Sequence, residues 1–162
     1  MIALALSLAT ILLAPSAATA VQGSVQAPPC AGSATRWEVK SEAGLVLEEG
    51  PCREGRPEGR WIYRHDNGVV AAEGTFTGGE RDGRWVFRFP NGSVASEGAY
   101  VGGLEHGPWV ERSGTGDVEE GTYSQGERVG SWDMHTNEGA SLIIDYADDE
   151  PAELHAATAP GR

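Results

Sequence analysis

Large apolar residues and glycines recur at a fixed interval along the chain, and this pattern predicts the secondary-structure elements. Successive tryptophans lie 24, 24, 24 and 23 residues apart, at Trp37, Trp61, Trp85, Trp109 and Trp132. A glycine follows each of them seven residues later, at Gly44, Gly68, Gly92, Gly116 and Gly139. Because self-similarity at a fixed period marks a repeat architecture, the sequence predicts an array of about five units.

Each unit has the pattern of a β-hairpin. In the unit of Trp61, two short strand-like runs meet at Asn67-Gly68, and Asn91-Gly92 repeats this pattern in the next unit. Asn-Gly favours a two-residue type I′ turn, which needs positive φ at both residues. Such a turn places Trp61 opposite Gly74 and, in the next unit, Trp85 opposite Gly98. We therefore expect each ring to cover the glycine opposite it, where it restores packing that glycine cannot supply.

The same register sorts the side chains onto two faces, because directly opposed residues share a face. One face is the predicted core, which collects the tryptophans, Tyr63, Phe87 and a valine column at Val46, Val70, Val94 and Val118. The other face carries a basic row, Lys40, Arg64, Arg88 and Arg112, and a glutamate column, Glu49, Glu73, Glu97 and Glu120. Glu73 is expected between Arg60 and Arg64. These charges indicate a solvated face with cross-strand ion pairs, or a row that meets an anionic partner.

The combined pattern resembles the MORN repeat, in the tryptophan-bearing variant found in bacterial proteins. The matching segments are Gly59-Arg60-Trp61, Asn67-Gly68, Glu73-Gly74-Thr75-Phe76 and Gly79-Glu80-Arg81-Asp82-Gly83, and they recur one unit later. The resemblance covers residues 35 to 146. It implies an all-β fold in which successive hairpins form one elongated, twisted, single-layer antiparallel sheet. It also implies a scaffold or interaction module, and phospholipid binding has been proposed for the family.

The two ends of the chain depart from the repeat. Residues 1 to 20 hold a short uncharged apolar run followed by Ala18-Thr19-Ala20, which predicts an export signal cleaved after Ala20. The run is too short for a membrane span. Residues 21 to 34 are predicted to be a linker and residues 147 to 162 a disordered acidic tail. Cys30 and Cys52 are expected to form a disulfide in the oxidising compartment that export implies, with Cys52 standing where later units have an aromatic residue.

The net charge and the candidate chemical groups narrow the range of possible functions. The net charge of −12 disfavours nucleic acid and, more weakly, an anionic membrane surface as partners. The four histidines fall at unrelated points of the repeat without metal-ligand spacing, and no catalytic signature stands out, so neither a metal nor a cofactor is expected. The sequence thus predicts an exported, non-catalytic module that binds a protein partner or plays a structural role in the envelope or outside the cell. A phospholipid-binding module and an enzyme acting on envelope glycans are the alternatives, and the oligomeric state is left open.

Overall fold

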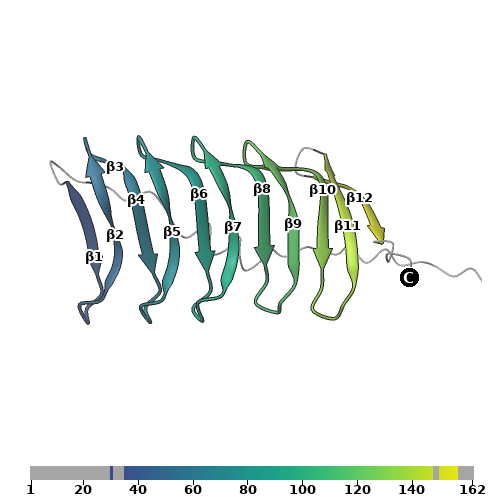
Figure 1. Cartoon of the computed structure of the whole chain (residues 1–162), viewed down its shortest axis with the longest axis horizontal. Coiled ribbons are helices and arrows are strands. Elements are labelled where there is room, and N and C mark those ends of the chain that lie inside the picture. Colours follow the sequence, from purple (N-terminus) through teal and green to yellow (C-terminus); the bar gives the residue numbers. More distant parts are fainter. Residues whose placement is uncertain (1–29, 31–34, 148–149, 157–162) are drawn as a thin grey trace, which may run out of the picture.

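The described residues form one open antiparallel sheet whose strands, apart from a two-residue strand that pairs only with the second strand, lie side by side in chain order (Figure 1). The structure, a computed structural model, describes Cys30, residues 35–147 and residues 150–156, so the predicted signal segment and most of the predicted linker lie outside the described residues. The strands are β1 (Arg36–Lys40), β2 (Val46–Arg53), β3 (Arg56–Pro57), β4 (Gly59–Arg64), β5 (Val70–Thr77), β6 (Glu80–Arg88), β7 (Val94–Val101), β8 (Leu104–Arg112), β9 (Val118–Ser124), β10 (Glu127–His135), β11 (Ser141–Ala147) and β12 (Glu150–Ala156). The all-β hairpin array expected from the repeat is confirmed.

The last strand corrects one sequence-based expectation. A disordered tail was predicted from residue 147, but β12 pairs antiparallel with β11, for example with His155 opposite Ile143. A strand edge exposes a row of unpaired N–H and C=O groups. The backbone of β12 satisfies that edge of β11, and the sheet therefore extends one strand beyond the fifth hairpin.

The Asn-Gly turns differ from the prediction. Gly68 N–H donates to the His65 carbonyl and His65 N–H donates to the Val69 carbonyl, so three residues lie in the loop. Gly68 has a φ of +84°, whereas Asn67 is not among the described non-glycine residues with positive φ. Asn67 Oδ1 instead accepts a hydrogen bond from Val69 N–H (3.1 Å). The turn is therefore a three-residue loop closed by a left-handed glycine and not a type I′ turn.

A β-bulge in the second strand of the hairpin restores the predicted register between the two strands. A loop one residue longer would shift the second strand and move its side chains to the wrong face. The pairing slips between Arg64–Val70 and Tyr63–Ala72, with Ala71 as the extra residue. Beyond this bulge the predicted pairing of Trp61 with Gly74 is confirmed.

The bulge also explains the uneven spacing of the tryptophans. The first and third hairpins have the same slip, with Leu47 and Ala95 as the extra residues. The fourth and fifth hairpins pair without a slip. The fourth hairpin thus lacks the bulge residue, whereas its turn keeps the same length. The interval from Trp109 to Trp132 is therefore 23 residues instead of 24.

Type I′ geometry occurs at the opposite ends of the strands, where one hairpin passes to the next. Gly78 and Gly79 connect β5 to β6 with φ values of 62° and 99°. The corresponding turn between β9 and β10 contains Gln125 and Gly126, at 54° and 86°. Positive φ at both positions of a two-residue loop matches the twist of the flanking strands.

The tryptophans join each hairpin to the one before it. A Cβ built on Gly74 would overlap the ring of Trp85, and the same relation holds for Gly50 with Trp61 and for Gly98 with Trp109. The expectation that Trp61 itself covers Gly74 is therefore wrong, although the two residues pair. The β5–β6 ladder is interrupted between Glu73 and Thr75, and there the Trp85 indole crosses onto the neighbouring hairpin.

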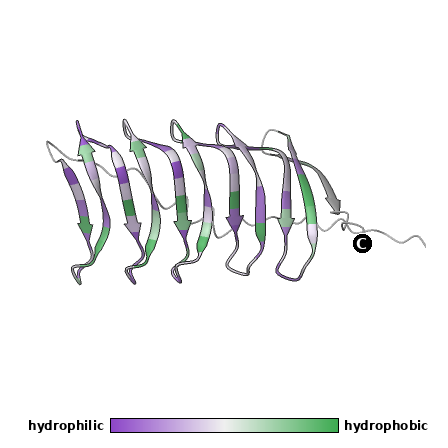
Figure 2. Ribbon diagram, viewed as in Figure 1, coloured by the Kyte–Doolittle hydropathy of each residue, from purple (hydrophilic) through white to green (hydrophobic). Residues whose placement is uncertain are grey.

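These rings form a continuous aromatic core on one face of the sheet. Trp61, Trp85, Trp109 and Trp132 are at most 1% exposed. Trp85, Trp109 and Trp132 each lie edge-on between two aromatic residues of the next column, and Trp61 lies edge-on against the first of them, with ring centroids 5.1–6.2 Å apart. The column consists of Phe76, Tyr100, Tyr123 and Tyr146. Edge-to-face pairs of this kind add to the stabilisation from burial. Residues of high hydropathy also recur at similar levels along successive strands (Figure 2).

The first hairpin is closed by the predicted disulfide. Cys30 and Cys52 are bonded and both are buried. Cys52 pairs with Pro57 as Phe76 pairs with Arg81, so it occupies the aromatic column at the end of the array. The Cys30 carbonyl lies beside Gly55 of the first inter-hairpin turn.

Candidate functional site

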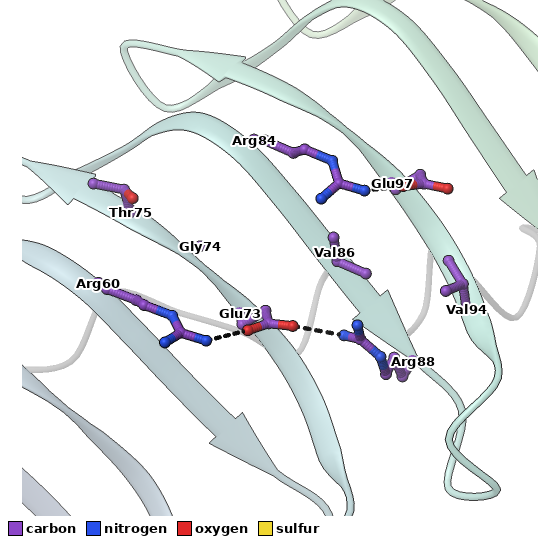
Figure 3. Close-up of a pocket in the computed structure, with 9 residues that line it drawn as sticks. All are labelled: Arg60, Glu73, Gly74, Thr75, Arg84, Val86, Arg88, Val94 and Glu97. Atoms are coloured by element: carbon purple, nitrogen blue, oxygen red, sulfur yellow. Dashed lines mark hydrogen bonds and ion pairs between the residues drawn. The ribbon is translucent and has the colours of Figure 1, made fainter.

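The face opposite the aromatic core carries the predicted basic row and glutamate column, and the structure brings them together. Glu73 forms an ion pair with Arg60 of its own hairpin (2.7 Å) and with Arg88 of the next hairpin (3.0 Å) (Figure 3). The carboxylate thus bridges two hairpins. Its pKa is lowered, chiefly by the hydrogen bond from Arg60 and also by the charge of Arg88.

The same bridge recurs in the neighbouring hairpins. Glu49 pairs with Arg36 (2.6 Å) and Arg64 (2.9 Å), and Glu97 pairs with Arg84 and Arg112. Arg64 was expected beside Glu73, but the register between hairpins places it beside Glu49. Three glutamates are therefore shared by six arginines, and we call this set the ion-pair network.

The ion-pair network ends where the repeat loses its charges. In the described part of the chain no hairpin precedes Lys40, which pairs instead with Glu38 on its own strand (2.7 Å). At the other end, the positions equivalent to Arg60 and Arg88 around Glu120 are Pro108 and His135. Glu120 is exposed. The network thus spans the first four hairpins.

An open depression lies within this network, with an apolar floor (Figure 3). Val86 and Val94 line it together with Arg84, Arg88 and Glu97. The valine column was expected on the core face. Because the three-residue turn shifts the register by one residue and the bulge restores it only beyond the valine, Val94 lies opposite Arg88 and shares its face, as Val70 does with Arg64.

A second polar cluster lies on the aromatic face and was not predicted. Glu111 is 1% exposed and occupies the position that Tyr63 and Phe87 fill in earlier hairpins. It forms an ion pair with Arg128 (2.7 Å) and accepts a hydrogen bond from the Tyr123 hydroxyl (2.9 Å). A single charge in an otherwise apolar column, two residues after each tryptophan, is the sequence signal that could have revealed this site.

Arg128 connects this cluster to the end of the array. It also pairs with Glu119 (2.8 Å), donates to the Tyr146 hydroxyl (3.0 Å) and lies 4.1 Å from the centroid of the Trp132 ring. Burial raises the pKa of Glu111, while the neighbouring Arg128 opposes this shift. The cluster links β8, β9, β10 and β11 through charge-assisted hydrogen bonds.

No protein-family model matches the sequence, and a search of curated proteins finds no match. Among the described residues, no helix is long and apolar enough to cross a membrane. The same part of the chain holds no group of three or more histidine, cysteine, aspartate or glutamate residues arranged for a metal ion.

Proposed function

We propose that this protein is an exported, non-catalytic, MORN-like repeat module that binds a protein partner or plays a structural role in the cell envelope or outside the cell. The observation that carries the proposal is the arrangement of its polar groups. The ion-pair network repeats once per hairpin along an open sheet, with each glutamate joined to two arginines. Such a surface suits extended contact along its length, whereas catalysis needs groups that converge on one reacting atom.

Export is supported by the Cys30–Cys52 disulfide, since disulfides persist in oxidising compartments. It is also supported by the apolar run of residues 1 to 20, which resembles a secretory signal. Amino-terminal sequencing of the protein recovered from its native host tests this part of the proposal. A mature chain that begins at Val21 is expected, and one that retains residues 1 to 20 contradicts cleavage.

The interaction role is tested by affinity capture from the native envelope fraction, followed by binding measurements with the purified captured protein. The variants Arg60→Glu and Arg84→Glu replace exposed cations of the ion-pair network. Arg53→Glu, beside the β2–β3 turn, is the matched control. A direct complex between purified components supports the proposal. Failure of every captured protein to bind directly contradicts it.

Phospholipid binding is a second candidate, favoured by the excess of cations in the ion-pair network. The side chains of Arg36, Arg60 and Arg84 remain 64–72% exposed although each contacts a glutamate. Co-sedimentation with anionic liposomes at low salt is the test, with Arg53→Glu as control. Binding that weakens with added salt and is lost in Arg60→Glu supports this candidate, and absence of such binding excludes it.

A further inference from the structure

The outer edge of β1 lacks two contacts that the second, third and fourth hairpins each make with the hairpin before them. In four successive hairpins, the tryptophan indole Nε1 donates to a backbone carbonyl of the hairpin before it: Trp61 to Pro51, Trp85 to Thr75, Trp109 to Ala99 and Trp132 to Thr122. Trp37 is the first of the series. Its Nε1 is shielded from solvent and has no hydrogen-bond partner among the described residues.

Lys40 shows the same deficit. The equivalent residues Arg64, Arg88 and Arg112 each reach the glutamate that precedes the covered glycine in the hairpin before. Within the described sheet, β1 pairs only with β2, so Lys40 has no such glutamate and turns to Glu38. The edge strand therefore carries one indole N–H without an acceptor and one cation whose carboxylate partner lies on its own strand instead of on a preceding hairpin.

The internal hairpins show which kind of segment would contact both Trp37 and Lys40. The strand before each tryptophan has the sequence Glu-Gly-x, as in Glu73-Gly74-Thr75. The glutamate binds the cation, the glycine leaves room for the ring, and the carbonyl of the third residue accepts the indole N–H. Any larger residue at the middle position would overlap the ring.

We propose that the β1 edge binds an extended segment of another protein with an acidic residue followed by glycine, added antiparallel to β1. Main-chain pairing supplies affinity in such strand addition, and the side-chain positions supply selectivity. The acidic residue meets Lys40, the glycine lies under Trp37, and the next carbonyl accepts from Trp37 Nε1. This inference rests on the proposed interaction role and names the kind of partner.

A second copy of this chain does not offer the required strand at its other end. The repeat positions equivalent to Glu73-Gly74 are Ile143-Ile144 in the last hairpin, and Ile144 is buried. The β12 strand then pairs with β11. The array is therefore closed to continuation at this end, and the partner of the β1 edge is expected to be a different protein.

The experiment uses the full mature chain and a labelled peptide, VAAEGTFT, which copies residues 70–77. Fluorescence anisotropy is expected to show saturable binding. The same peptide with valine in place of its glycine, or glutamine in place of its glutamate, is expected to bind at least about tenfold more weakly. Valine would overlap the Trp37 ring, and glutamine lacks the charge that pairs with Lys40. In ¹H–¹⁵N spectra, only the Trp37 indole N–H among the five tryptophans is expected to move strongly.

Conservative variants test the contacts from the protein side. Trp37→Phe keeps a ring but removes the donor, and Lys40→Gln removes the cation; both are expected to weaken peptide binding about tenfold. Arg53→Gln is the matched control and is expected to bind normally. Equal binding of the parent and valine peptides, or no binding of either, overturns the proposal.

Two further outcomes separate this inference from the broader function. If the peptides fail but affinity capture still yields a direct partner, the β1 edge is not the binding site and the interaction role survives. If light scattering shows an oligomer of this chain that Trp37→Phe dissociates, the edge binds a second copy, and the commitment to a different protein is wrong.

Discussion

The ring of Trp85 fills the space above Gly74 of the preceding hairpin, and this relation joins successive hairpins into one sheet. The indole then donates to the Thr75 carbonyl (3.0 Å), so one side chain supplies both the packing and a hydrogen bond across the interrupted ladder. The stability of the array therefore depends on the bare backbone at Gly74 as much as on the ring.

Gly74→Ala is expected to lower the free energy of unfolding by about 1–3 kcal/mol or more, because the new methyl group overlaps the Trp85 ring. Urea unfolding followed by tryptophan fluorescence measures the loss. Gly114→Ala is the matched control, since a Cβ there meets nothing within 4 Å. Equal effects of the two substitutions would contradict the packing relation.

Trp85→Ala is expected to cost about 3–5 kcal/mol, as for other large buried aromatic residues. Trp85→Phe retains much of the ring but loses the bond to Thr75, and should fall between this variant and the parent protein. The same denaturation series measures both. A loss below about 0.5 kcal/mol for the alanine variant, typical of a surface position, would reverse the assignment of the core face.

Reduction of the Cys30–Cys52 bond is expected to lower the melting temperature. The bridge closes a loop across a separation of 22 residues. In the chain-entropy model such a loop contributes about 3 kcal/mol. Calorimetry with and without reductant, with the Cys30→Ser/Cys52→Ser double variant as control, measures the effect. The reductant should leave the melting temperature of the double variant unchanged.

Glu73 and Glu111 are expected to give opposite pH dependences. The folded-state pKa of Glu73 lies below its ordinary value of 4.5, so its contribution is present above that value and is lost as the pH falls through the folded pKa. The pKa of Glu111 is raised above 4.5, so the folded state favours its protonated form, and stability is lost as the pH rises through the folded pKa.

Relative to the parent protein, Glu73→Gln should therefore become less stable as the pH rises from 3 through the ordinary carboxyl range. Glu111→Gln should gain stability relative to the parent as the pH rises above 4.5. Urea unfolding at several pH values measures both slopes. Slopes of the same sign would show that the two carboxylates do not lie in the different environments described.

Gln125→Gly is expected to stabilise the protein by up to about 1 kcal/mol. Gln125 has a φ of +54°, where a side chain is disfavoured, and the equivalent Gly102 has a φ of +58°. The greater freedom of glycine in the unfolded chain offsets part of the gain. The reverse change, Gly102→Gln, should destabilise, and thermal unfolding of the pair checks both directions.

The sequence by itself determined the repeat, the hairpin order, the pairing of Trp61 with Gly74 and the disulfide. These depend on spacing along the chain, and a hairpin is closed by residues close together in sequence. Two local errors cancelled in that prediction. The turn at Asn67-Gly68 is one residue longer than expected, and the bulge at Ala71 restores the register.

Only the tertiary structure decided how one hairpin meets the next. The ladder between hairpins is interrupted at each glycine and tryptophan, so simple alternation could not show that Trp85 covers Gly74, that Arg88 reaches Glu73, or that Val94 shares a face with Arg88. Likewise, Glu111 is buried where the second and third hairpins place an aromatic ring, because Arg128, 17 residues away, supplies the compensating charge. Such contacts depend on the stagger between neighbouring strands, which the repeat period alone does not specify.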